Sequence, residues 1–285
     1  MTLTQLEIFI TVAETGNFTR AAEHLYMTQS AVSHAIASLE RELGVVLLQR
    51  GRTGVTMTTV GEQVLLHARS IVEHVECIRQ ETAQVRGVKT GKLRIGSFPS
   101  VSKGIFPPLL GSFRRTYPGI EVTLLEGTDQ EVYDWLVSCA VDIAVVTLPT
   151  AGVESIPLAT DEMVAVLPVD HVLAKNAAVQ VERLATDPFI MSKAGCEPLI
   201  KTIFAHVGVT PHVAFEASDP AVVLAMVQEG LGITILPRLS LSESPLHASV
   251  LALDPPIFRQ LGLAVRSRTS LSPATKAFLL HVETR

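Results

Sequence analysis

The chain has 285 residues, of which 47% are hydrophobic and 18% charged, a composition that excludes a disordered protein and allows two or three globular domains. Its net charge of −5 is divided into −1 over residues 1–90 and −4 over residues 91–285, so bulk basicity does not indicate a nucleic-acid partner. No apolar run is long enough to span a bilayer, the first residues do not resemble a signal peptide, and the three cysteines are widely spaced. We therefore expect a cytoplasmic protein without a membrane segment or a disulfide framework.

The first 43 residues predict three short helices with apolar residues at helical spacing. Asn17 and Thr28 suit the N-cap positions of the second and third helices. Only residues 26–28 separate these two helices, and a turn that short between two helices is typical of a helix-turn-helix. We place this motif at about residues 18–37.

Two predicted strands, 45–49 and 55–58, follow the third helix and enclose a loop that contains Arg50 and Arg52. This pattern predicts a wing, which completes a domain of residues 1–58. The wing has no acidic residue and adds local positive charge that the whole chain lacks.

Residues 59–88 form the predicted linker helix. It opens with the capping-box spacing Thr59 to Glu62. Apolar residues then alternate at spacings of four and three: Val64, Ala68, Ile71, Val75, Ile78, Thr82 and Val85. This coiled-coil pattern favours pairing with a second copy of the chain; the alternative is packing against the chain's own domains.

Residues 89–285 alternate apolar strands with helices, which predicts an α/β domain with a parallel sheet. Similar residues or residue pairs recur 90 or 91 positions apart: Phe113 and Phe204, Val122 and Val213, Thr128–Asp129 and Ser218–Asp219, and Asp142–Ile143 and Gly232–Ile233. The repeat predicts two lobes, lobe I at 91–161 and 266–285 and lobe II at 162–265. A ligand is expected between the lobes, beyond the carboxyl ends of the strands.

The third helix turns its apolar stripe inward, so a polar face is left for another purpose. That face carries Thr28, Gln29, Ser30, Ser33 and His34. A glutamine amide can bond an adenine edge at two points, and hydroxyls suit bases or phosphate. Read alone, the same residues also fit an ordinary solvated helix face.

Several segments together resemble the LysR-type transcriptional regulators, namely Asn17 to Ala22, Thr28 to Ser33, Leu39–Glu40, Leu43–Gly44, and Thr58 with Gly61. The resemblance departs at Leu48, where the family usually has Phe, and at His34, where it often has Arg or Lys. It implies a winged helix-turn-helix, a dimerising linker helix and a two-lobed effector domain like that of periplasmic binding proteins.

The resemblance also implies effector contacts at places where strands end and helices begin. Carried over position by position, these are Ser100, Ser102, Thr128, Thr147, Gly195 and Cys196. Hydroxyls and helix N-termini favour a small anion or carboxylate, and Lys193 is a candidate for additional charge. Taken singly, each residue also fits a helix cap, and Cys196 suits packing or effector contact better than redox sensing.

We find no nucleophile elbow, phosphate loop, metal-ligand spacing or cofactor motif, and so expect neither catalysis nor a cofactor. The leading interpretation is a ligand-responsive regulator that binds double-stranded DNA as a homodimer through the linker helix, with a tetramer left open. The alternative is a small-solute binding protein or enzyme on the two-lobed fold, whose N-terminal part is an oligomerisation module that does not bind DNA.

Overall fold

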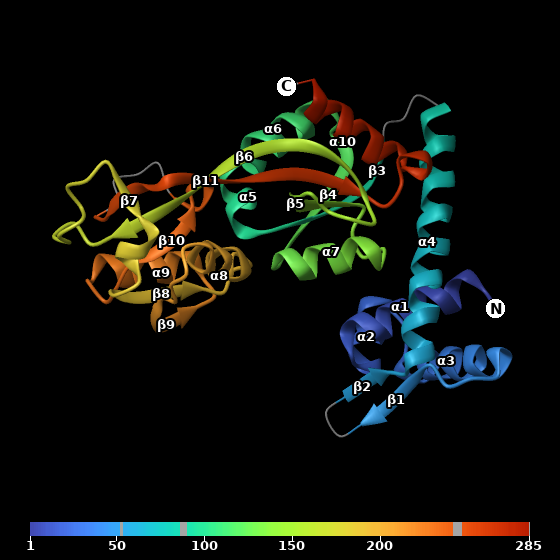
Figure 1. The fold of residues 1–285 in the computed structure, drawn as a ribbon. Helices are drawn as coiled ribbons and strands as arrows, with labels where there is room; N and C mark the ends of the chain where they lie inside the picture. Colours follow the sequence, from blue (N-terminus) through green and yellow to red (C-terminus); the bar gives the residue numbers. More distant parts are fainter. Residues whose placement is uncertain (52–53, 86–89, 242–246, 285) are drawn as a thin grey trace. The chain divides into compact units, whose positions relative to one another are not determined.

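The computed structural model describes residues 1–51, 54–85, 90–241 and 247–284 (Figure 1). Its contacts divide the chain into two units, one of residues 1–89 with 138–140 and one of residues 90–137 with 141–285. Among the described residues, no helix is both long and apolar enough to cross a membrane.

The N-terminal unit begins with helices α1 (Leu3–Thr15), α2 (Phe18–His24) and α3 (Gln29–Leu43). Asn17 Oδ1 accepts from the backbone N–H groups at the start of α2, and Thr28 Oγ1 accepts from that of Ala31 at the start of α3. Both predicted N-caps are confirmed. The three helices enclose a core that includes Phe9, Ala21 and Leu39, so the helix-turn-helix is held by packing as well as by its caps.

The wing is the antiparallel pair β1 (Leu48–Gly51) and β2 (Gly54–Met57). Its first strand begins three residues later than predicted, because Glu40 Oε1 accepts from the backbone N–H groups of Leu47 and Leu48 at 2.7 and 3.1 Å. The Val55 N–H donates to the Gly16 carbonyl at 2.9 Å and fixes the wing to the end of α1.

Helix α4 (Thr59–Val85) follows the wing. The Gly61 N–H donates to Thr58 Oγ1 at 2.9 Å, so the cap lies one residue before the predicted position at Thr59. Along the predicted seam, Ala68 is buried in the N-terminal core, whereas Ile71 and Ile78 remain 41% and 60% exposed. The later part of the seam therefore has apolar side chains left for a partner.

The second unit contains the predicted repeat. One half comprises β3 (Thr90–Ser97), α5 (Pro99–Gly104), α6 (Phe106–Thr116), β4 (Gly119–Glu126), α7 (Asp129–Val137) and β5 (Ile143–Leu148). The other comprises β8 (Pro188–Ser192), α8 (Glu197–His206), β9 (His212–Ala217), α9 (Pro220–Gln228) and β10 (Thr234–Pro237). Phe113 and Phe204 are both buried, each in the core of its own half.

Two long strands, β6 (Glu154–Leu167) and β11 (Ser249–Val265), run between the halves, as Figure 1 shows. They pair antiparallel with each other, and β11 also pairs antiparallel with β5. The prediction of a parallel sheet is right for β3, β4 and β5 and for β8 and β9, and wrong for these two strands. They are antiparallel because the chain passes to the second half along β6 and returns along β11.

The remaining elements complete the cores. Strand β7 (Ala178–Gln180) pairs with β11, and helix α10 (Pro273–Glu283) packs Phe278 at an edge-to-face angle against Phe113. Short 3-10 turns lie at Val181–Leu184, Arg238–Ser240 and Arg268–Ser270.

Candidate functional site

Helix α3 has a buried side and a polar side. Val32, Ile36 and Leu39 are almost fully buried against the N-terminal core. The opposite side presents the residues predicted to contact DNA: Thr28, Gln29, Ser30 and His34 are exposed and Ser33 is half-buried. The Thr28 hydroxyl is engaged by the helix cap and by Ser30 Oγ at 3.0 Å, so Gln29 and His34 have the greater freedom to meet a ligand.

Of the two wing arginines, the structure describes Arg50. Arg50 belongs to β1, where it lies opposite Val55, and Arg52 lies outside the described residues.

The turn before α3 contributes a residue that sequence reasoning missed. Tyr26 has a left-handed backbone with φ of 54° and a side chain that is 98% exposed, beside the start of the recognition helix. The only signal for it was its place in the short predicted turn.

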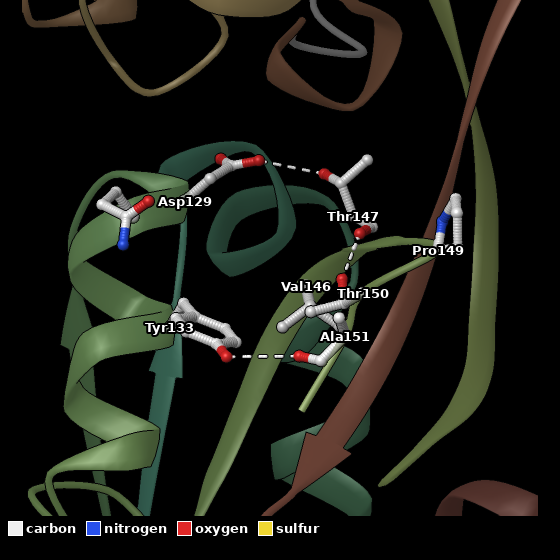
Figure 2. Close-up of a pocket in the computed structure, with 8 residues that line it drawn as sticks. Asp129, Tyr133, Val146, Thr147, Pro149, Thr150 and Ala151 are labelled. Carbon is white, nitrogen blue, oxygen red and sulfur yellow. Dashed lines mark hydrogen bonds between the residues drawn. The ribbon is translucent and has the colours of Figure 1, made fainter. Parts of the chain in front are cut away.

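In the second unit, residues from both lobes meet at Asp129. Figure 2 shows the Asp129 side chain, from the start of α7, pointing toward Thr147 at the end of β5. Thr147 Oγ1 donates to Asp129 Oδ2 at 2.9 Å. From the other lobe, Gly195 comes so close that a Cβ added there would lie 2.9 Å from Asp129 Oδ1. Gly195 also has φ of +98°, so this close approach requires glycine.

A pocket of about 390 Å³ opens beside this contact (Figure 2). It is lined by Asp129, Gln130, Tyr133, Val146, Thr147, Pro149, Thr150 and Ala151. Its volume lies in the range that suits a small molecule. Burial raises the pKa of the Asp129 carboxyl, and the Thr147 hydroxyl and the charge of Arg259 oppose that shift.

A buried ion pair lies where the paired strands β6 and β11 pass from one lobe to the other. Arg259 and Asp161 are partners in the strand register, and their side chains are 4% and 1% exposed. Arg259 Nε and Nη2 donate to Asp161 Oδ2 at 3.0 and 2.7 Å, and the Leu239 N–H donates to Oδ1 at 3.1 Å. The Arg259 guanidinium also lies 5.2 Å from the centre of the Phe98 ring.

Arg259 links this pair to a predicted effector residue. Its Nη2 donates to Ser100 Oγ, from α5, at 2.6 Å. A small cavity of about 10 Å³ adjoins the contact, bordered by Arg259, Ser100, Ser192 and Cys196 among others. That volume is roughly one water probe, so these groups leave room for little more than a water molecule. Sequence reasoning missed Arg259, Asp161 and Asp129 as site residues, because neither an arginine inside a strand nor an aspartate at a helix start is distinctive.

Of the predicted effector residues, Thr147 and Gly195 lie against Asp129, and Ser100 and Cys196 lie beside Arg259. Thr128 is adjacent, but its hydroxyl donates to Glu131 Oε2 at 2.8 Å, a contact within the start of α7. Ser102 is buried, and its hydroxyl has no hydrogen-bond partner among the described residues. It does not border either cavity, whose linings are otherwise polar at several points.

Three residues in and beside the 193–196 loop have defined electrostatic surroundings. Burial raises the pKa of the Cys196 thiol, so it is neutral near pH 7. Ser192 Oγ lacks a well-formed hydrogen bond among the described residues, although it lies near this thiol, a weak partner. Lys193 forms ion pairs with Glu197 and Glu216 at 2.8 and 3.2 Å, so its charge is engaged by two carboxylates in this arrangement. Within the described ranges, no group of three or more His, Cys, Asp or Glu is placed to hold a metal ion.

Two family models together match nearly the whole chain. Residues 3–62 match the bacterial regulatory helix-turn-helix proteins of the lysR family, and residues 86–285 match the LysR substrate binding domain. The chain belongs to the LysR family. The resemblance inferred from sequence is therefore confirmed, as is the fold class of a helix-turn-helix domain joined to a two-lobed α/β domain.

Relatives of this LysR-family regulator match it from end to end. The chain is 39% identical over 282 residues to the HTH-type transcriptional regulator YvbU of Bacillus subtilis, covering 98% of this chain and 97% of that one. It is 37% identical over 282 residues to the probable HTH-type transcriptional regulator LrrA of Synechococcus elongatus, covering 98% and 95%. A full-length OxyR variant from Pseudomonas aeruginosa has the same fold, with a TM-score of 0.78, 25% identity and coverage of 100% and 97%.

These comparisons decide the class of protein. The family and its full-length relatives are DNA-binding transcriptional regulators with an effector-binding domain, and they are not enzymes. The alternative of a solute-binding protein or enzyme with an N-terminal module that does not bind DNA is thereby set aside.

Proposed function

We propose that this LysR-family regulator binds its operator through α3 and the wing, and that a small carboxylate bound between the lobes changes its affinity for that operator. The observation that supports this proposal is that residues of both lobes come together at two places: Gly195 against Asp129, and Arg259 against Ser100. The proposed contacts are the sequence-derived set with Asp129 and Arg259 added.

The ligand acts through the angle between the lobes. The cavity beside Arg259 is far too small for a metabolite, so a ligand that contacts both Arg259 and Asp129 requires the 193–196 loop to move away from Asp129. A ligand that touches both lobes then favours one arrangement, and only such a difference in affinity between states can shift the protein.

The assembly follows from α4 in the same proposal. Ile71 and Ile78 are exposed on a predicted coiled-coil seam, and a second copy of the chain would cover them. A homodimer places two recognition helices on two half-sites of double-stranded DNA. Pairing of dimers into tetramers is a further expectation, and a cytoplasmic location fits a protein whose target is DNA.

A thermal-shift screen of small carboxylates, followed by gel shifts on the DNA upstream of the gene, tests this function. We expect at least one acid to raise the melting temperature, since a ligand that binds only the folded state stabilises it. The same acid should change the amount of protein needed to shift the DNA. Binding without any change in the gel shift would contradict the proposal.

Thr147→Val should weaken effector binding by roughly tenfold, as expected when a hydrogen bond to a charged group is lost at nearly constant volume. The valine removes the hydroxyl that donates to Asp129 Oδ2, so the carboxylate is no longer held in place. Calorimetric titration of a stabilising acid measures the change. Thr160→Val is the matched control, because Thr160 bonds Gln260 on the exposed surface. Equal loss of affinity in both variants would remove Thr147 from the site.

Arg52→Ala should weaken binding to operator and random DNA alike, and reduce the salt dependence of binding by about one phosphate contact. This prediction rests on the place of Arg52 in the wing sequence, because the residue lies outside the described ranges. Fluorescence anisotropy at several salt concentrations gives the slope. A slope equal to that of the parent protein would contradict a phosphate contact.

A further inference from the structure

The groups that meet between the lobes do not balance in charge. Asp129 and Asp161 contribute two carboxylates, and Arg259 contributes one guanidinium that already pairs with Asp161. The buried Cys196 thiol is neutral, and Lys193 is held by two glutamates. The site therefore carries one uncompensated negative charge when Asp129 is ionised.

Two positions remain open to a ligand. Arg259 uses Nε and Nη2 for Asp161 and Ser100, while its Nη1 makes no hydrogen bond with any described residue. Asp129 accepts from the Thr147 hydroxyl on one oxygen, and its other oxygen lies against Gly195, which has no side chain to offer. Arg259 thus needs a hydrogen-bond acceptor, and Asp129 needs a donor.

A plain carboxylate satisfies only the first of these needs. Placed near Arg259, it would bring the site to two uncompensated negative charges. In a partly buried region, the repulsion between the ligand carboxylate and Asp129 is weakly screened. A ligand with an ammonium group as well cancels the charge of Asp129 and supplies the missing donor. Charge-assisted hydrogen bonds of that kind are among the stronger ones in proteins.

We propose that the effector is a small zwitterion, of the amino-acid class, whose ammonium group binds Asp129 and whose carboxylate binds the open edge of Arg259. This inference rests on the proposed effector site and narrows its ligand. Asp161 is a positioning residue: it fixes the Arg259 side chain so that one edge of the guanidinium stays directed away from the ion pair.

The test compares three series of compounds on the full-length protein: proteinogenic L-amino acids, the 2-hydroxy acids of the same skeletons, and the unsubstituted acids. Melting temperatures identify the compounds that bind, and calorimetry measures their affinities. We expect at least one amino acid to bind about tenfold or more tighter than its unsubstituted acid. The inference is overturned if no amino acid binds, or if the hydroxy or unsubstituted acid binds as tightly.

Asp129→Asn provides a reversal that general destabilisation cannot imitate. The amide keeps the size and the acceptor for Thr147 but removes the negative charge. Amino-acid affinity should fall about tenfold, while affinity for the unsubstituted acid should rise. Arg238→Gln is the control, since Arg238 is half exposed and pairs with Glu162 outside the proposed ligand contacts. Weaker binding of both ligand types in Asp129→Asn would contradict the assignment.

The pH dependence gives a second readout. Asp129 faces Thr147 from β5, Gly195 and Cys196 from the loop before α8, and the charge of Arg259 from β11. An ammonium ligand favours its ionised form, so amino-acid affinity should fall as the pH falls through the raised pKa of Asp129. In Asp129→Asn this dependence should disappear. Its persistence would place the ammonium elsewhere.

These outcomes separate the two proposals. If only hydroxy or unsubstituted acids bind and they change operator affinity, the ligand class is wrong and the proposed function stands. If an amino acid binds with the predicted dependence on Asp129 but leaves operator affinity unchanged, the ligand class stands and the proposed function fails.

Discussion

Charging the α4 seam with Ile71→Glu and Val75→Glu is expected to convert the protein from a dimer to a monomer. Both residues lie on the seam, and Ile71 is 41% exposed in the single chain, so its apolar surface is available to a second copy. Pairing would bury carboxylates without partners, which is strongly unfavourable. Light scattering after size-exclusion chromatography reports the change directly.

The affinity of the same variant for its operator should fall by roughly a hundredfold or more, because tethering two half-site contacts in one dimer raises affinity by that factor through effective concentration. Leu66→Glu is the matched control. Leu66 is 40% exposed on α4, and five residues from Ile71 it is turned by roughly 140° away from the seam. An unchanged oligomer in the double variant, or equal dissociation in the control, would show that the seam is not the interface.

Gln29→Ala is expected to remove most of the discrimination between operator and random DNA while the protein stays folded. Gln29 is the first residue of α3 and is exposed, so truncation disturbs no core. Loss of a bidentate amide contact to adenine corresponds to about 1–3 kcal/mol for each half-site. Anisotropy titrations with operator and scrambled DNA of equal length measure the ratio of affinities.

The control for Gln29→Ala is Gln63→Ala. Gln63 is an exposed glutamine on α4 that lies outside the recognition helix. That control should keep the parent ratio. Parent-level discrimination in Gln29→Ala would mean that another residue on this face reads the sequence, with His34 and Tyr26 the next to examine.

Features governed by neighbouring residues could be predicted from the sequence. The caps at Asn17 and Thr28 depend on side chains that reach two or three residues along the chain, and the structure has both. The internal repeat was equally visible, because Phe113 and Phe204 serve the same packing role in similar halves. Binary pattern and capping chemistry carry this information locally.

Features made by distant residues were missed or misplaced. Arg259 and Asp161 are 98 positions apart and meet only because β6 and β11 pair antiparallel. The start of β1 moved because Glu40, on another element, captures two backbone N–H groups. Asp129 was visible at a helix start, but its exposure to a pocket and to Gly195 depends on how the two lobes close.

The most direct test of a ligand-responsive regulator is reciprocal linkage on the full-length protein. Operator affinity is measured with and without saturating effector, and effector affinity is measured with and without saturating operator. We expect the effector to change operator affinity, and the operator to change effector affinity by the same factor, as linkage between two coupled sites requires. Effector binding that leaves operator affinity unchanged would contradict this expectation.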